Sequence, residues 1–120
     1  MILIVEDDPL ARRALESLFA AHGYAAQGVP SAEDALEALN DIARPGMVLI
    51  DIDLPGMSGL ELLRRLQREI PELPCTLMSA ADHDLSPWSS QPVVPFLPKP
   101  LNVSRLFSVV RDQHPSSPVA

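Results

Sequence analysis

The sequence has almost no cysteine: Cys75 is the only one in 120 residues. A single cysteine cannot build an internal disulfide framework, so we expect the chain to work in a reducing compartment, the cytoplasm. Cys75 lies in the apolar stretch PCTLMSA. We therefore interpret it as a small buried hydrophobe and not as a reactive thiol.

Long hydrophobic runs and an excess of positive charge are also missing. The N-terminal stretch MILIVEDD carries no basic residue, and its apolar run is too short for a signal peptide or a membrane span. Lysine and arginine number 9 against 16 acidic residues, which gives a formal net charge of −7. Nucleic acids and anionic membrane surfaces attract basic proteins, so we expect neither as a direct partner. The acidic balance suits cation binding or a partner with a basic patch.

Apolar runs and helix signals alternate along the chain. Runs that predict strands cover residues 2–5, 24–29, 47–51, 75–80 and 93–97. Helix starts are indicated between them by the capping residues Asp8, Ser31 and Ser58, and Asn102 caps a closing helix that ends near residue 113. Short connections between alternating strands and helices favour an α/β fold, a doubly wound parallel sheet with helices on both faces.

One segment does not fit this alternation. A helix is expected between Ser79 and Lys99, but Pro87, Pro92 and Pro95 interrupt it, so we predict a short or degenerate fourth helix there. We hypothesise that the chain signals through a remodelled face or through loop ordering; the alternative is that this segment drifted because another face carries the output. The tail 114–120, HPSSPVA, has linker composition, which leaves residues 1–113 as the domain.

Polar side chains stand where several of the predicted strands end. In a doubly wound sheet these ends meet at one edge, where ligands bind. The residues are Glu6 and Asp7 after the first strand, Asp51 after the third, Ser79 after the fourth and Lys99 after the fifth. Neighbouring carboxylates repel each other, and a hard cation such as Mg²⁺ relieves the repulsion. Together with a lysine and a hydroxyl, they equip this edge to handle a phosphoryl group.

Four stretches in this order, ILIVEDD, LIDIDLPGMSGLEL, LMSA and FLPKP, resemble the receiver domain of two-component response regulators. The resemblance spans residues 2–100. It implies a flavodoxin-like five-stranded sheet in the order 2-1-3-4-5. It also implies a phosphorylation-dependent switch, which is no conventional enzyme although it catalyses its own phosphoryl transfer and autodephosphorylation.

The resemblance assigns roles to individual residues. Asp51 would accept the phosphoryl group from a phosphohistidine of a sensor histidine kinase or a histidine phosphotransfer protein. Lys99 would pair with Asp51 and then with the phosphoryl oxygens, and Ser79 would donate a hydrogen bond to them. Phe96 would be the switch aromatic, exposed in the inactive state and buried in the active one. The Lys99–Pro100 bond is expected to be cis, as it typically is in the family.

The resemblance also implies a Mg²⁺ or Mn²⁺ site. Asp7 would be the main acidic ligand, Glu6 would act through a metal-bound water, and Asp51 would touch the metal. Asp53 would contribute its backbone carbonyl, while its side chain would tune the access of water to the acyl phosphate. We assign Asp8 to capping the first helix and leave it out of the metal site.

Two other functions remain open. The chain could be an interaction module that has kept the fold and lost phosphorylation. Less favoured is a haloacid-dehalogenase-type phosphatase, whose D-x-D pattern Asp51 and Asp53 match, because 120 residues leave no room for a cap. The resemblance also implies a downstream effector domain or protein as a partner, and a homodimer is a further candidate. We interpret His22, His83 and His114 as ordinary surface histidines. We interpret Trp88 as a side chain that covers the edge of the hydrophobic core.

Overall fold

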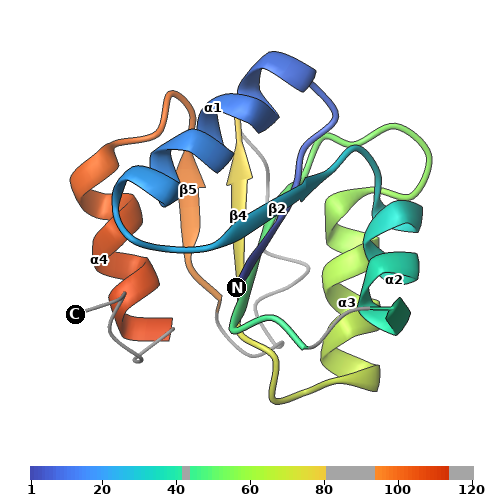
Figure 1. The fold of residues 1–120 in the computed structure, drawn as a ribbon. Helices are drawn as coiled ribbons and strands as arrows, with labels where there is room; N and C mark the ends of the chain where they lie inside the picture. Colours follow the sequence, from blue (N-terminus) through green and yellow to red (C-terminus); the bar gives the residue numbers. More distant parts are fainter. Residues whose placement is uncertain (42–43, 81–93, 114–120) are drawn as a thin grey trace.

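The computed structural model describes residues 1–41, 44–80 and 94–113. Along the chain the elements are β1 (Ile2–Val5), α1 (Pro9–Ala21), β2 (Ala26–Val29), α2 (Ala32–Asp41), β3 (Met47–Asp51), α3 (Gly59–Glu69), β4 (Cys75–Ser79), β5 (Phe96–Pro98) and α4 (Val103–Gln113). All strand pairs are parallel, and the sheet order is β2-β1-β3-β4-β5 (Figure 1). The predicted fold class and strand order are confirmed.

Some predicted boundaries differ from the observed ones. β2 begins at Ala26 and not at Tyr24, and β5 begins at Phe96 and not at residue 93. The proline-rich segment in which we expected a short or degenerate fourth helix falls on residues 81–93, outside the described residues. The label α4 therefore refers to the helix Val103–Gln113, which the sequence analysis called the closing helix. Other predictions that lie outside the described residues concern His83, Trp88, His114 and the tail 114–120.

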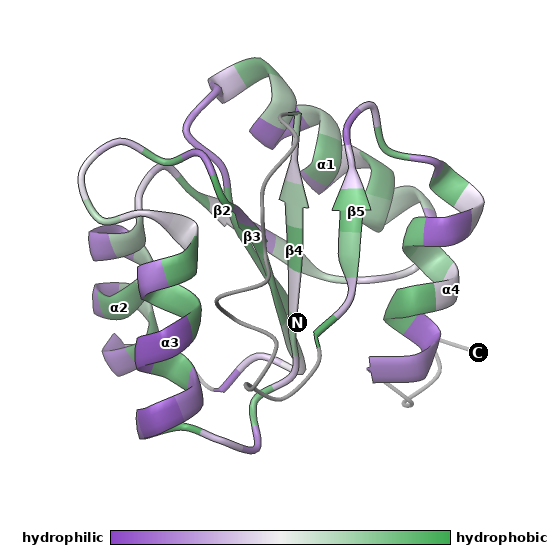
Figure 2. Cartoon of the chain, turned by 180° about the vertical axis from the view of Figure 1, so that it is seen from behind, coloured by the Kyte–Doolittle hydropathy of each residue, from purple (hydrophilic) through white to green (hydrophobic). Residues whose placement is uncertain are grey.

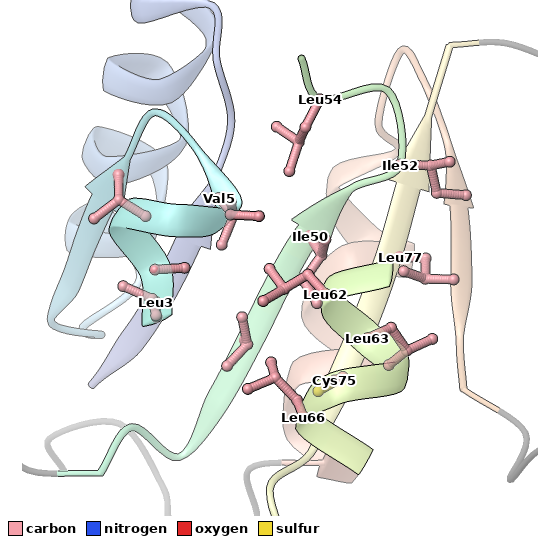
Figure 3. Packing of buried hydrophobic residues seen from close by; sticks show 14 of the residues in the cluster. Leu3, Val5, Ile50, Ile52, Leu54, Leu62, Leu63, Leu66, Cys75 and Leu77 are labelled. Carbon is pink, nitrogen blue, oxygen red and sulfur yellow. The ribbon is translucent and has the colours of Figure 1, made fainter. Parts of the chain in front are cut away.

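Two hydrophobic layers hold the helices against the sheet. Side chains alternate along each strand, so Leu3 and Ile50 point to the face covered by α2 and α3, while Ile4 and Leu49 point to the face covered by α1 and α4. Figure 3 shows the first layer, in which α3 packs its leucines onto β3 and β4. The three central strands β1, β3 and β4 are buried along their whole length, because helices cover both faces of the sheet. In Figure 2 most of β4 has the colour of hydrophobic residues.

Cys75 belongs to the first of these layers. Its side chain is buried and is not in a disulfide. Burial raises the pKa of the Cys75 thiol to about 12, which keeps it protonated near neutral pH. The interpretation of Cys75 as a buried hydrophobe is therefore confirmed.

The predicted helix caps are present. Asp8 accepts a hydrogen bond from the backbone N–H of Leu10, and Pro9 occupies the first helical position of α1. Ser31, Ser58 and Asn102 accept hydrogen bonds from backbone N–H groups in the first turns of α2, α3 and α4. Capping therefore fixes the residue at which each helix begins, next to the carboxyl ends of the strands. Within the described residues no helix is long and apolar enough to cross a membrane.

Gly59 sets the distance between α3 and the end of β3. A Cβ added to Gly59 would lie 2.2 Å from the carbonyl oxygen of Asp51 and 2.7 Å from the Cα of Ile52. The N–H of Gly59 also donates to the carbonyl oxygen of Ile52, at 3.1 Å. Only glycine allows the helix to start this close to the strand. The loop that carries Asp53 is consequently short and fixed at both ends.

Candidate functional site

Strand register brings the predicted site residues to one edge of the sheet. Asp51 lies beside Met78, and Ser79 lies beside Pro98, so the carboxyl ends of β3, β4 and β5 are level. Lys99 follows β5 directly, and its backbone N–H donates to the carbonyl oxygen of Ser79 at 2.8 Å. In Figure 1 the arrowheads of β4 and β5 point to this edge, from which the chain also enters α1.

Lys99 joins two carboxylates at this edge. Its Nζ donates to Asp51 Oδ2 at 2.9 Å and to Glu6 Oε1 at 2.5 Å. The side chain of Lys99 is 25% exposed, whereas those of Glu6 and Asp51 are 1% and 6% exposed. The Lys99–Pro100 peptide bond is cis, as predicted. The predicted pair of Lys99 with Asp51 is present, and Glu6 is an additional partner that the sequence did not indicate.

Burial and charge shift the protonation equilibria of Glu6 and Lys99. Burial raises the pKa of Glu6 from 4.5 to about 7, since the lowering by Lys99 is smaller and the neighbouring Asp51 raises it further. Burial alone would lower the pKa of Lys99, but its hydrogen bonds to Glu6 and Asp51 outweigh this, so the pKa stands above its ordinary value. Without another cation, Lys99 stays charged and Glu6 takes up a proton readily.

Three carboxylates could hold a metal ion here. Glu6, Asp7 and Asp51 each offer an oxygen, and these oxygens lie within 4.8 Å of one another. Asp7 is exposed, and Glu6 and Asp51 are buried. The donor set contains only oxygens, which suits a hard divalent cation such as Mg²⁺. Burial, with the nearby Asp51, raises the pKa of Glu6 and so disfavours its charged form, which a divalent ion would favour. The residues present therefore fit the metal that the sequence predicts.

The Asp51 carboxylate is fixed through both of its oxygens. Lys99 holds Oδ2, and Oδ1 accepts the backbone N–H of Asp53 at 2.9 Å. The side chain of Asp53 is turned to β4, where its Oδ2 accepts the hydroxyl of Ser79 at 2.5 Å. Asp53 is exposed, and Ser79 is 1% exposed. One network thus connects the loop after β3 with the end of β4.

Phe96 opens β5 and is partly buried. It packs against the hydrophobic layer beneath α2 and α3. In this structure the ring is therefore neither fully exposed nor fully buried.

Two helix residues also make contacts at the site that were not predicted. Arg12 in α1 donates from Nη1 to the carbonyl oxygen of Glu6 at 2.9 Å and to that of Asp7 at 3.4 Å, which fixes the loop after β1. Glu33 in α2 accepts the backbone N–H of Met57 at 3.3 Å and so steadies the loop after β3. Neither residue belongs to a strand end. No pattern in the sequence pairs these helix residues with distant loops.

His22 is the histidine that the structure describes. It caps the C-terminus of α1, is exposed, and stacks on Phe107 of α4 with ring centroids 3.9 Å apart. The prediction of a surface histidine is confirmed for this residue.

The chemistry available at this edge follows from these contacts. Asp51 is a carboxylate held in one orientation at the carboxyl end of a buried strand. A lysine and a hydroxyl stand near it, and neighbouring carboxylates can bind a divalent cation. A carboxylate nucleophile with cationic partners can accept an electrophilic group whose oxygens carry negative charge.

Comparison with known proteins agrees with this geometry. The sequence model for the response regulator receiver domain matches residues 2–111. The chain is 36% identical to transcriptional regulatory protein AfsQ1 of Streptomyces coelicolor over 84 residues, which are 70% of this chain and 36% of AfsQ1. It is 32% identical to response regulator MprA of a Mycobacterium species over 129 aligned positions, covering 98% of this chain and 55% of MprA.

Solved structures share the fold. The receiver domain of NtrX from Brucella abortus superposes with a TM-score of 0.83 at 29% identity, covering 98% of this chain and 100% of that one. The response regulator TrrA from Thermotoga maritima, solved in complex with Mg²⁺-BeF, has a TM-score of 0.81 at 28% identity, with 93% and 96% covered. The chain thus spans whole solved receivers but only part of AfsQ1 and MprA.

Proposed function

Because the chain belongs to the family of response regulator receiver domains, we propose that it is a switch that accepts a phosphoryl group on Asp51. Receiver domains are generally signalling modules and not enzymes. The observation that carries the proposal is the fixation of Asp51, whose two oxygens are held by Lys99 and by the backbone of Asp53.

The transfer would exchange one bond for another. An oxygen of Asp51 attacks the phosphorus of a phosphohistidine, the new O–P bond forms, and the N–P bond breaks. The imidazole leaves with the electron pair of that bond and takes up a proton from solvent. Lys99 orients Asp51 before the attack and then pairs with a phosphoryl oxygen, and Ser79 donates its hydroxyl to another.

Glu6, Asp7 and Asp51 would hold Mg²⁺ or Mn²⁺, together with the backbone carbonyl of Asp53. When bound, the ion would offset the negative charge that gathers around the phosphoryl oxygens. Arg12 keeps the backbone of Glu6 and Asp7 in place for this purpose.

The consequence of phosphorylation would be a shift between two conformations of the domain. Ser79 would move toward the phosphoryl group, and the half-buried ring of Phe96 would become buried. The changed surface would alter binding to an effector domain or protein. The donor would be a sensor histidine kinase or a histidine phosphotransfer protein in the cytoplasm.

Intact mass spectrometry tests this proposal. The parent is incubated with a small-molecule phosphodonor and Mg²⁺, beside Asp51→Asn and beside the parent with EDTA. We expect one phosphoryl group on the parent and none in either control. No gain, with Mg²⁺ binding retained, would instead support the phosphorylation-independent interaction module. Steady turnover of a phosphomonoester would support the phosphatase.

A further inference from the structure

The side chain of Asp53 makes a contact that the proposed function does not use. Its Oδ2 accepts the hydroxyl of Ser79, while its own backbone N–H donates to Asp51. The proposed function needs that same hydroxyl for the phosphoryl group on Asp51. A serine hydroxyl has one proton to donate, so Ser79 cannot serve both acceptors at once.

We propose that Asp53 is a positioning residue, which holds the Ser79 hydroxyl in the unphosphorylated protein and thereby sets how readily the phosphorylated conformation forms. This inference rests on the proposed function. It assigns to the Asp53 carboxylate a control over the switch, in addition to the metal ligation expected of its backbone carbonyl. It is also distinct from an effect on water access to the acyl phosphate.

The difference in burial makes such an exchange feasible. Ser79 is 1% exposed, so its hydroxyl needs an acceptor within the protein in either state. Asp53 is exposed, so water can solvate its carboxylate once the hydroxyl has left. Ser79 would exchange one charged acceptor for another, and the balance between the two acceptors would decide which state is populated.

Charge drives the exchange in one direction. Phosphorylation of Asp51 adds negative charge two residues from Asp53, whose backbone N–H lies against the accepting carboxylate. A like charge at this position disfavours the existing arrangement of Asp53, and the phosphoryl oxygens offer the hydroxyl a new acceptor. Before phosphorylation, neither effect operates and the Ser79–Asp53 hydrogen bond remains.

The first measurement examines the hydrogen bond without any phosphoryl chemistry. Urea unfolding in EDTA is followed for the parent, Asp53→Ala, Ser79→Ala and the double variant. We expect the double variant to lose less stability than the two single variants lose in sum. The difference should correspond to roughly a tenfold change in the unfolding equilibrium constant. Simple additivity would mean that the two side chains are not coupled and would overturn the inference.

The second measurement examines the switch itself. Beryllium fluoride with Mg²⁺ imitates a phosphoryl group in shape and charge, and its affinity is measured by calorimetry for the same four proteins. Asp53→Ala should tighten the binding of beryllium fluoride when Ser79 is present. This gain should be about five- to tenfold larger than the gain from the same substitution in Ser79→Ala. Asp53→Asn, which keeps an acceptor without the charge, should lie between the parent and Asp53→Ala.

The outcomes separate this inference from the proposed function. An equal gain from Asp53→Ala in both backgrounds would reflect relief of charge repulsion alone and would overturn the inference, although the receiver would still work. If the parent fails to bind beryllium fluoride, as Asp51→Asn should, the proposed function itself is wrong. In that case Asp53 controls no switch, whatever the unfolding data show.

Discussion

At the scale of single residues, the account depends on the position of Lys99 between two buried carboxylates. Its ammonium contacts both Glu6 and Asp51, and the three side chains are at most 25% exposed. Removing the cation from such a group leaves charges that water cannot fully solvate. We therefore expect the stability of the fold to depend on this cluster of charges.

Replacing Lys99 tests this dependence. Lys99→Met keeps the apolar stem and removes the charge, and we expect it to lower the free energy of unfolding by about 2 kcal/mol in EDTA. Mg²⁺ should restore part of the loss, because a cation again lies among the carboxylates. Urea unfolding with and without Mg²⁺ measures both effects.

Arg65→Met is the matched control for Lys99→Met. Arg65 pairs with Glu69 on the surface of α3, where the two side chains are 44% and 50% exposed. Such a pair contributes at most a few tenths of a kcal/mol, so the control should change stability little. Equal losses in the two variants would contradict the structural role given to Lys99.

Glu6 makes the stability of the metal-free protein depend on pH. Its pKa is raised from 4.5 to about 7, so the folded state binds the proton more tightly than the unfolded state does. The resulting contribution to stability is fully present below pH 4.5 and is lost as the pH rises through about 7. We expect the urea midpoint in EDTA to fall across this range in the parent and to change less in Glu6→Gln. A midpoint that rises with pH only in the parent would oppose this account.

The sequence predicted which side chains gather at this edge better than it predicted their contacts. Asp51, Ser79 and Lys99 were found because strand ends in a parallel sheet meet at one edge, a rule that needs no side-chain detail. The same rule placed Glu6 at this edge, 93 positions before Lys99, but it could not show that these two side chains meet. That contact depends on lysine rotamers and on strand twist, which the sequence pattern does not encode.

At the scale of elements, the close packing of the start of α3 against the end of β3 fixes the position of Asp51. The capped start of α3 lies directly against the carbonyl group of Asp51, and only the missing side chain of Gly59 permits this approach. The sequence predicted the capping by Ser58 but not this requirement. A serine three residues before a glutamate is a local signal. The close approach of backbone to backbone is visible only in the fold.

Gly59→Ala should separate the helix from the strand. The added Cβ would meet backbone atoms that cannot rotate away, so we expect a loss of about 3 kcal/mol in the free energy of unfolding and weaker Mg²⁺ binding. Gly28→Ala is the graded control, because a Cβ there meets side-chain atoms of Arg12 and Glu16. That variant should lose about 1 kcal/mol. Thermal or urea unfolding that ranks the two in the opposite order would contradict this view of the junction.

At the scale of the whole molecule, the sheet carries the candidate site on one edge and has a hydrophobic layer under helices on each face. The α/β prediction succeeded because the apolar strands and the helix caps agree on one fold. It located β5 less well, since that strand has three residues and directly follows the proline-rich segment. A short strand gives a weak pattern, and its pairing with β4 positions it.

A divalent cation should stabilise the entire fold if the three carboxylates bind it. Ligand that binds only the folded state adds about 2.7 kcal/mol at one hundred times its dissociation constant. We expect Mg²⁺ to raise the unfolding midpoint of the parent and to have a smaller effect on Asp7→Asn. Asp8→Asn removes the same charge from the neighbouring residue and keeps a capping side chain, so it should respond as the parent does. A response lost equally in both variants would point to general charge screening.

The most direct test of the central claim identifies the residue that carries the phosphoryl group. The protein is phosphorylated with a small-molecule donor and Mg²⁺, the acyl phosphate is reduced with borohydride, and the product is located by tandem mass spectrometry. The account predicts reduction to homoserine at Asp51 alone. Homoserine at Asp53 or Asp7, with Asp51 intact, would contradict the assignment of Asp51 as the acceptor that Lys99 holds in place.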